Sequence, residues 1–224
     1  MIYVLLIAKY LVNLTKDNLP IKKFLFVVIA HISLTLYSQT SMPISVQKAI
    51  NHELKSWISC LSGCTTSSFH ISDTTQMRQA NGEEFAELDS FFAIYKPLIN
   101  FSPDKRYFVD SYSYQLNLER KGDHFAANVE VDQQVFLYDT KNELSYSLFF
   151  GGTERWIDEE IWLGNDTLVL AGIEKDEKAT RHPIFYIVNI STGEIIQYSC
   201  TNLLCIQRID YGSPRLKKMK IEGL

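Results

Sequence analysis

The chain has 224 residues, of which 46% are hydrophobic and 12% are aromatic, and its formal net charge is −4. A chain of this length can bury a hydrophobic core of its own as a single domain. Its acidic balance argues against nucleic acid as a partner, because nucleic-acid binding depends on neutralising phosphates with lysine and arginine.

The segment 21–40 has the pattern of a secretory signal peptide. Lys22 and Lys23 give a positive start, an apolar run follows from Phe24 to Leu36, and Ser38 is a small residue at a suitable cleavage point. The leader resembles those of exported proteins of Bacteroidetes-type bacteria, which combine a Lys-Lys start, a phenylalanine-containing apolar run and cleavage before Gln-Thr. The domain is therefore expected in an extracytoplasmic compartment, either periplasmic or secreted.

We divide the chain into a leader or anchor, residues 1–38, and a single β-rich globular domain, residues 39–224. The leader carries a net charge of +3, so −4 less +3 leaves −7 for the domain. Because residues 1–20 precede the signal pattern with an apolar run of their own, two interpretations stay open. Either translation starts later than written, or residues 1–36 are kept as a membrane anchor, and only then is a membrane partner expected.

The first predicted element of the domain is an amphipathic helix over 43–59. Val46, Ile50, Leu54 and Trp57 recur at intervals of three to four residues and therefore lie on one face. This is the one N-terminal helix that we expect, and its apolar face is expected to pack against a sheet.

Four cysteines, Cys60, Cys64, Cys200 and Cys205, form two close pairs in the sequence. In an oxidising compartment all four are disulfide candidates, and three connectivities are possible. A crossed pairing would close a loop of about 140 residues and stabilise the fold more than two small loops would. An all-cysteine metal site is an alternative, but its spacing would be looser than the usual Cys-x2-Cys, so we expect no metal and no cofactor.

From residue 66 onward the chain is rich in tyrosine and phenylalanine and is divided by short polar turns, which favours strands. The predicted fold is mainly β: an antiparallel meander of short strands, forming either a partial propeller-like sheet or a sandwich. The segment 80–90 is polar and is predicted as a loop or a short helix. The predicted strands are Phe69–Ser72, Phe91–Tyr95, Tyr107–Tyr112, Tyr114–Leu118, Ala127–Val131, Gln134–Asp139, Leu144–Phe149, Glu160–Leu163, Thr167–Gly172, Ile184–Ile190 and Glu194–Ser199.

Aspartates occur repeatedly in or beside the predicted turns. Their carboxylates can accept hydrogen bonds from backbone N–H groups two residues on, so Asx-turns explain most of them without a calcium ion. These residues are Asp104, Asp110, Asp123, Asp139 and Asp166.

Two pairs of segments give a weak internal repeat. Residues 135–147 align with 185–197 at an offset of 50, and residues 101–110 align with 162–171 at an offset of 61. Each pair combines apolar strands with polar turns such as Ser-Pro-Asp. Over 99–199 this pattern resembles the blades of β-propellers such as the WD-repeat and TolB-like groups. Because complete propellers need about four to eight blades, the resemblance implies only a partial propeller-like sheet, and it implies no catalytic residues.

The segment around the second and third tryptophans is the strongest candidate for a binding site. In an extended conformation Trp156, Asp158, Glu160 and Trp162 share one face, where they would bind a sugar or a cation. The alternative is that the tryptophans are core or edge residues and that the carboxylates lie in a solvated turn. Carboxyls on one strand would not straddle a substrate as a glycosidase requires, so the hypothesis is binding rather than hydrolysis.

No catalytic motif is present: there is no Gly-x-Ser-x-Gly elbow, no His-Glu-x-x-His and no phosphate-binding glycine-rich loop. The histidines of the domain are scattered without metal-ligand spacing and are interpreted as surface or interface side chains rather than metal ligands: His52, His70, His124 and His182. A basic cluster near the C-terminus is interpreted as a solvated tail, with an anionic partner or membrane headgroup as the alternative. It comprises Arg215, Lys217, Lys218 and Lys220.

The sequence therefore predicts an exported, non-catalytic, β-rich domain that binds a protein or a glycan. Two alternatives stay open. One is a membrane-tethered structural or assembly factor, and the other is an extracytoplasmic hydrolase whose site is assembled from scattered loop residues.

Overall fold

The computed structural model describes residues 41–80 and 87–222, so the predicted leader, residues 1–38, lies outside it. The compact unit Met42–Leu224 carries all the elements discussed below. Within the described ranges no helix is long and apolar enough to span a membrane.

The helices are α3 (Ile44–Glu53), α4 (Lys55–Ile58), η1 (Thr66–Ser68), α5 (Leu88–Tyr95) and α6 (Pro214–Lys217). The strands are β1 (Leu61–Ser62), β2 (Phe69–Gln76), β3 (Arg78–Gln79), β4 (Asn100–Phe101), β5 (Tyr107–Asp110), β6 (Leu116–Lys121), β7 (His124–Val129), β8 (Gln133–Asp139), β9 (Leu144–Gly151), β10 (Arg155–Trp162), β11 (Thr167–Lys175), β12 (Arg181–Asn189), β13 (Glu194–Cys200), β14 (Ile206–Gln207) and β15 (Ile221–Glu222).

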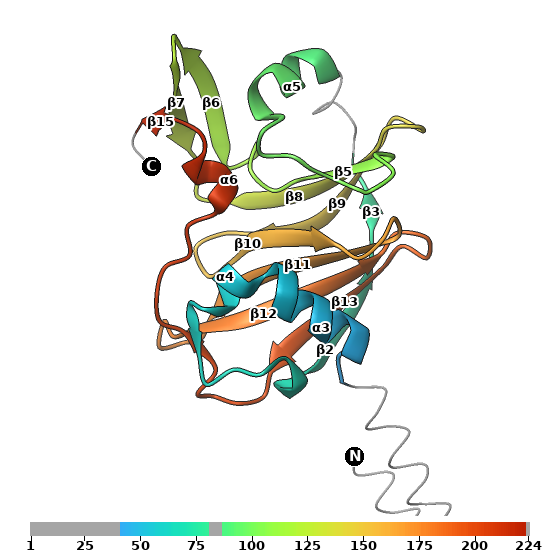
Figure 1. Cartoon of the computed structure of the whole chain (residues 1–224), viewed down its shortest axis with the longest axis vertical. Coiled ribbons are helices and arrows are strands. Elements are labelled where there is room, and N and C mark those ends of the chain that lie inside the picture. Colours follow the sequence, from blue (N-terminus) through green and yellow to red (C-terminus); the bar gives the residue numbers. More distant parts are fainter. Residues whose placement is uncertain (1–40, 81–86, 223–224) are drawn as a thin grey trace, which may run out of the picture. The chain divides into compact units, whose positions relative to one another are not determined.

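Two five-stranded antiparallel sheets form the body of this unit (Figure 1). The α3-side sheet has the order β10-β11-β12-β13-β2, and the α5-side sheet has the order β3-β9-β8-β5-β4. Their inner faces share one hydrophobic core, because alternate residues along each strand point to the same face. This core includes Val109, Val135, Leu137, Leu168, Leu170 and Val188. The predicted fold class, mainly β with short antiparallel strands, is confirmed.

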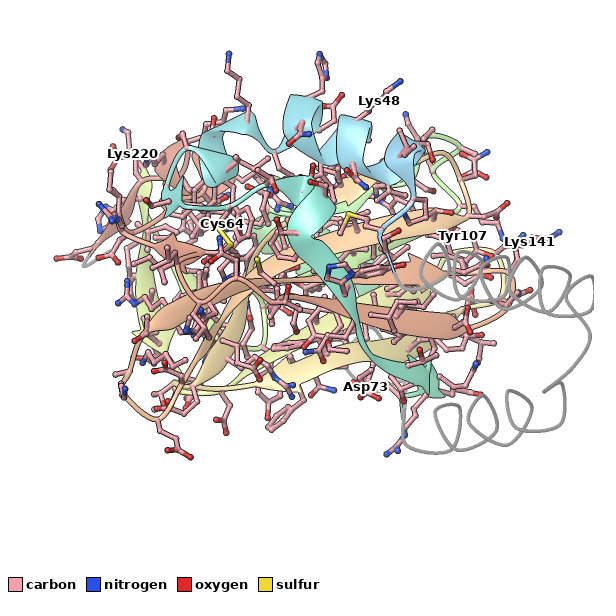
Figure 2. All side chains as sticks on the ribbon, turned by 90° about the horizontal axis from the view of Figure 1, so that it is seen from below. Lys48, Cys64, Asp73, Tyr107, Lys141 and Lys220 are labelled. Carbon is pink, nitrogen blue, oxygen red and sulfur yellow. A yellow bond between two sulfur atoms is a disulfide. The ribbon has the colours of Figure 1, made fainter. Side chains whose placement is uncertain are left out.

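A helical layer covers the outer face of each sheet. Helices α3 and α4 lie along the α3-side sheet in Figure 1, where Ile50 and Trp57 pack against Val169 and Phe185. Lys48, on the opposite side of α3, points away from the sheet in Figure 2. The predicted helix over 43–59 is thus present as two helices, which meet at Leu54.

The predicted strand Phe91–Tyr95 is wrong, because these residues belong to helix α5. An unbroken apolar run has no helical or strand periodicity of its own, so its length and neighbours must decide. Here the helix begins at Leu88, before the polar Asp89 and Ser90, and the aromatic rings of the apolar run cover the outer face of the α5-side sheet. Phe92 packs edge-on against Phe108 of β5 with the ring centroids 5.3 Å apart.

The two sheets repeat one topology. The meander β4-β5-β8-β9 corresponds to β10-β11-β12-β13, and each has one further strand, β3 or β2, beside its last strand. The offset of the repeat changes from 61 to 50 because 24 residues separate the aligned segments 101–110 and 135–147, whereas 13 separate 162–171 and 185–197. The longer connection contains the hairpin β6–β7, which leaves the sheet. The turns also correspond: Asp139 accepts a bond from Asn142 N, and Asn189 accepts one from Thr192 N, both at 3.1 Å.

The described residues thus form a two-sheet meander rather than a closed propeller. The resemblance to propeller blades stays a prediction.

One segment, residues 69–79, forms an edge of both sheets. Its first part, β2, pairs with β13, and its second part, β3, pairs with β9. The edge is unsuited to pairing with another strand, because Ser72 forms a bulge and Asp73 places a charge at mid-strand. Figure 2 shows Asp73 at the rim of the sheet.

The disulfide has the crossed connectivity. Cys64 and Cys205 are bonded across a sequence separation of 141, beside the short pair β1–β14. Cys60 and Cys200 are free thiols, so two of the four disulfide candidates are bonded to each other and two are not bonded. Cys60 lies across the β1–β14 ladder from Arg208, whose N–H bonds to its carbonyl, and Cys200 ends β13. The disulfide ties the helical N-terminal segment to the end of the α3-side sheet.

Candidate functional site

The predicted binding residues of β10 do not share one face. A bulge between Ile157 and Glu159 makes Asp158 an extra residue in the ladder with β11. A one-residue bulge reverses the alternation of the strand, so residues on its two sides exchange faces. Trp156 consequently packs on the α3 side of the sheet, whereas Trp162 packs in the core between the sheets. This corrects the extended arrangement predicted for the four residues.

Asp158 lies at the centre of one half of the predicted site. Its two oxygens accept hydrogen bonds from the indole nitrogens of Trp57 and Trp156, both at 2.8 Å. Burial raises the pKa of Asp158 to about 6, although these bonds and nearby Arg181 act in the opposite direction. Asp158 therefore connects helix α4 to β10 with a carboxylate that is costly to ionise.

Because the folded pKa of Asp158 exceeds its ordinary value of 3.8, the folded state binds its proton more tightly than the unfolded state does. This stabilisation is complete below about pH 4 and is lost as the pH rises through about 6. We expect the wild type to lose up to about 3 kcal/mol over this range, relative to Asp158→Asn. Chemical denaturation between pH 4 and 8 checks this. Unfolding free energies that stay parallel for the two proteins would contradict it.

The second half of the predicted site is a buried ion-pair cluster. Arg215 pairs with both Glu159 and Glu160, and its side chain is 17% exposed. Ser111 donates to Glu160 at 3.0 Å and Tyr211 donates to Glu159 at 2.8 Å. The carboxylates are thus satisfied inside the protein, which corrects the interpretation of Arg215 as part of a solvated basic tail.

A different region, the turn-end pocket, gathers polar side chains from both sheets. It has a volume of about 630 Å³ and lies where the β4–β5, β8–β9, β10–β11 and β12–β13 turns meet. Figure 2 shows Tyr107 and Lys141 at this end of the molecule. The side chains important for its chemistry are those of Arg106, Tyr107, Asp139, Asn142, Tyr146 and Asp166.

The carboxylates of the turn-end pocket are not equivalent. Asp139 is buried and accepts bonds from Arg106 at 3.0 Å and from the N–H groups of Lys141 and Asn142. Burial raises its pKa, but these bonds outweigh burial and hold the pKa below its usual range. This is the predicted Asx-turn role, which Asp104 and Asp110 also fulfil through Arg106 N and Tyr112 N. Asp166 is exposed at the pocket.

Trp162 does not line the turn-end pocket but packs against Tyr107, which does. Its ring lies nearly parallel to that of Tyr107, with the centroids 6.5 Å apart, and its indole donates to Asn100 O at 3.3 Å. The Arg106 guanidinium lies over the Tyr107 ring, 4.8 Å from its centroid. Tyr107 is buried by these neighbours, and the partly buried Tyr146 is the more accessible ring. The sequence could not show this pocket, since its residues come from four separate turns.

The remaining candidates do not form a centre. His52, His124 and His182 each lie near an acidic side chain at the surface or at its margin. Across residues 41–80 and 87–222, no group of three or more histidine, cysteine, aspartate or glutamate side chains is arranged to hold a metal ion.

Comparison with known proteins gives no family for this chain. No known protein family matches it, and no curated protein matches it in sequence. Among solved structures it is similar to a protein of Clostridium novyi NT described as a putative conserved lipoprotein. The identity is 16%, the match covers 46% of this chain and 60% of that chain, and the TM-score is 0.29. Function must therefore be inferred from the residues of this chain.

Proposed function

We propose that this protein is an exported, non-catalytic domain that binds a glycan in the turn-end pocket. The observation that carries the proposal is the joining of two tyrosines and several hydrogen-bonding side chains in one open pocket of about 630 Å³. Pockets of a few hundred Å³ with a few convergent polar groups are typical of small-ligand sites. Sugar hydroxyls both donate and accept hydrogen bonds, which matches carboxylate, amide and guanidinium partners.

The charge of the pocket selects among glycans. Arg106 and Asp139 neutralise each other, so the exposed Asp166 leaves the pocket with a negative charge. Asp166 can accept hydroxyl protons but would repel the carboxylate of an acidic sugar. Tyr146 offers the accessible ring on which an apolar sugar face can stack. The preferred ligand is therefore a neutral glycan.

Export is supported by the disulfide, since such bonds persist in oxidising compartments, and by the leader pattern. The intact mass of the protein from its own host tests it. We expect a mass that matches Gln39–Leu224 with two alkylated thiols, from Cys60 and Cys200. A mass that retains residues 1–38 would support the membrane-tethered alternative instead.

Binding is tested by screening the domain against an array of neutral and acidic glycans, followed by calorimetry with the neutral glycans that bind. Asp166→Asn should weaken binding at least tenfold, because a hydrogen bond to a charged group contributes roughly 1.5–3 kcal/mol. Tyr146→Ala should also weaken it, because the variant removes the ring on which the sugar stacks. Asp123→Asn is the matched control, since Asp123 is an exposed carboxylate on the β6–β7 turn. Equal affinities for Asp166→Asn and Asp123→Asn would place binding elsewhere, and an array without signal would overturn the glycan proposal.

A further inference from the structure

A second, smaller cavity lies beside Asp158, and we call it the Asp158 pocket. It has a volume of about 210 Å³. Its walls come from β10, from the connection between β5 and β6, from the end of β7 and from the segment that leads into α6. The side chains that carry its chemistry are Tyr112, Gln115, Trp156, Asp158, Tyr211 and Ser213.

The Asp158 pocket combines three aromatic rings with a carboxylate. Tyr112, Trp156 and Tyr211 supply ring surface, and Asp158 supplies the charge. Rings attract cations through their negative faces, and a carboxylate next to them adds direct electrostatic attraction. Each oxygen of Asp158 accepts one indole N–H, so each keeps a second acceptor position.

The hydroxyl of Tyr112 is the second, independent feature of this pocket. Tyr112 is only 6% exposed, and its hydroxyl has no partner with hydrogen-bond geometry in the described part of the chain, although the Ser213 side chain lies near enough to lower its pKa. A buried polar atom without a partner costs free energy, on the order of 1–3 kcal/mol. A ligand that donates a hydrogen bond inside the pocket would remove this cost.

The surrounding charges favour a positive ligand. Ionised Asp158, Glu159 and Glu160 carry three negative charges, against the single positive charge of Arg215. Arg215 lies 5.3 Å from the centre of the Tyr112 ring but is bonded to both glutamates. Arg181 and Lys175 lie over Trp156, and Arg181 is paired with Asp210. Counting Arg181, Asp210 and Lys175 as well, four negative charges stand against three positive ones, so the charge around the pocket is net negative.

We propose that the Asp158 pocket binds the primary ammonium group of a small amine, which donates hydrogen bonds to Asp158 and to the hydroxyl of Tyr112. An anion would be repelled by the acidic cluster. A neutral alcohol could hydrogen-bond to Tyr112 and to Asp158, but it would lack the attraction between a positive charge and the carboxylate. This site is distinct from the turn-end pocket, and the proposal does not depend on glycan binding.

The test uses n-propylammonium chloride as the probe and 1-propanol as a neutral analogue of similar size, with sodium chloride to match ionic strength. Binding to the full domain is followed by tryptophan fluorescence and calorimetry, because Trp57 and Trp156 both bond to Asp158. We expect saturable binding of propylammonium and at least tenfold weaker binding of propanol. Equal affinity for the two compounds, or stronger binding of tetramethylammonium, which has no N–H donor, would overturn the proposal.

Two variants locate the site. Asp158→Asn should weaken propylammonium binding at least tenfold, and Tyr112→Phe, which removes only the unpartnered hydroxyl, should weaken it several-fold. The second variant keeps the test decisive if Asp158→Asn fails to fold, because the bonds from Trp57 and Trp156 do not involve Tyr112. Asp166→Asn, in the turn-end pocket, should bind as the wild type does. Loss of binding in Asp166→Asn but not in Tyr112→Phe would overturn the assignment.

Affinity should also depend on pH. The ammonium group requires ionised Asp158, whose pKa is about 6, so binding should be about tenfold weaker at pH 5 than at pH 7. The charged groups that act on Asp158 are Glu159, itself bonded to Arg215, and Arg181. Because protonation of Glu159 would act in the same direction, pH-independent binding would contradict a role for this acidic cluster.

Discussion

Replacing both Cys64 and Cys205 with alanine is expected to lower the free energy of unfolding by up to about 5 kcal/mol. The bond closes a loop of 141 residues, and in the chain-entropy model the stabilisation by a disulfide grows with loop length. Cys205 is fully buried, so the lost sulfur contacts add to the effect. Urea denaturation of the oxidised wild type and of the double variant measures the difference.

The matched control is the double variant Cys60→Ala with Cys200→Ala. Both of these thiols are free and only partly buried, so we expect a change of about 1 kcal/mol or less. Reduction of the wild type should reproduce the loss seen in Cys64→Ala with Cys205→Ala. If the control pair were as destabilised as the disulfide pair, the connectivity described here would be wrong.

Arg215→Ala is expected to destabilise the domain by about 3–5 kcal/mol. Removing one partner of a buried ion pair leaves uncompensated charges, and here two carboxylates lose their cation together. The Glu160 side chain is fully buried and that of Glu159 is 12% exposed, so water cannot replace the guanidinium without rearrangement. Arg215 also donates to Leu98 O at 2.9 Å, which is a further lost bond.

Lys220→Ala is the control for this prediction. Lys220 belongs to the same basic cluster in the sequence and pairs with Asp123, but its side chain is 72% exposed. Exposed pairs contribute roughly 0–1 kcal/mol. A triple variant, Arg215→Met with Glu159→Gln and Glu160→Gln, removes the charges together and should regain part of the loss. Equal effects of Arg215→Ala and Lys220→Ala would show that burial does not govern this cluster.

Most of the sheet structure could be predicted from the sequence, because alternating apolar residues between turn residues fix strands locally. Ten of the eleven predicted strands overlap strands of the structure, Phe91–Tyr95 being the exception. That segment is apolar throughout, and only its place above Phe108 and Phe101 decides that it is helical. The predicted leader, residues 1–38, lies outside the described residues, so it stays a prediction.

The site was harder to predict than the fold. The segment that carries Trp156 and Asp158 was identified because charged and aromatic residues cluster there. The bulge at Asp158 was not detectable, because it depends on pairing with β11 rather than on any residue typical of a bulge. The involvement of Arg215 was not detectable either, since its partners lie more than 50 residues away in the chain. The residues next to Arg215 in the sequence cannot show that it is buried while its basic neighbours are exposed.

Residues 69–79 form an edge of both sheets, and their pairing also determines when the α3-side sheet can be completed. β2 hydrogen-bonds to β13, so Gln76 meets Glu194 and Phe69 meets Cys200. Nearly the whole chain must therefore be synthesised before the α3-side sheet can be completed. Contacts this distant in sequence make folding slow, because the entropy of closing the long loop is lost before the contact stabilises anything. In a newly made chain the α3-side sheet thus lacks its edge strand β2 until β13 has emerged, whereas the strands of the α5-side sheet, which all lie between residues 78 and 151, can pair earlier.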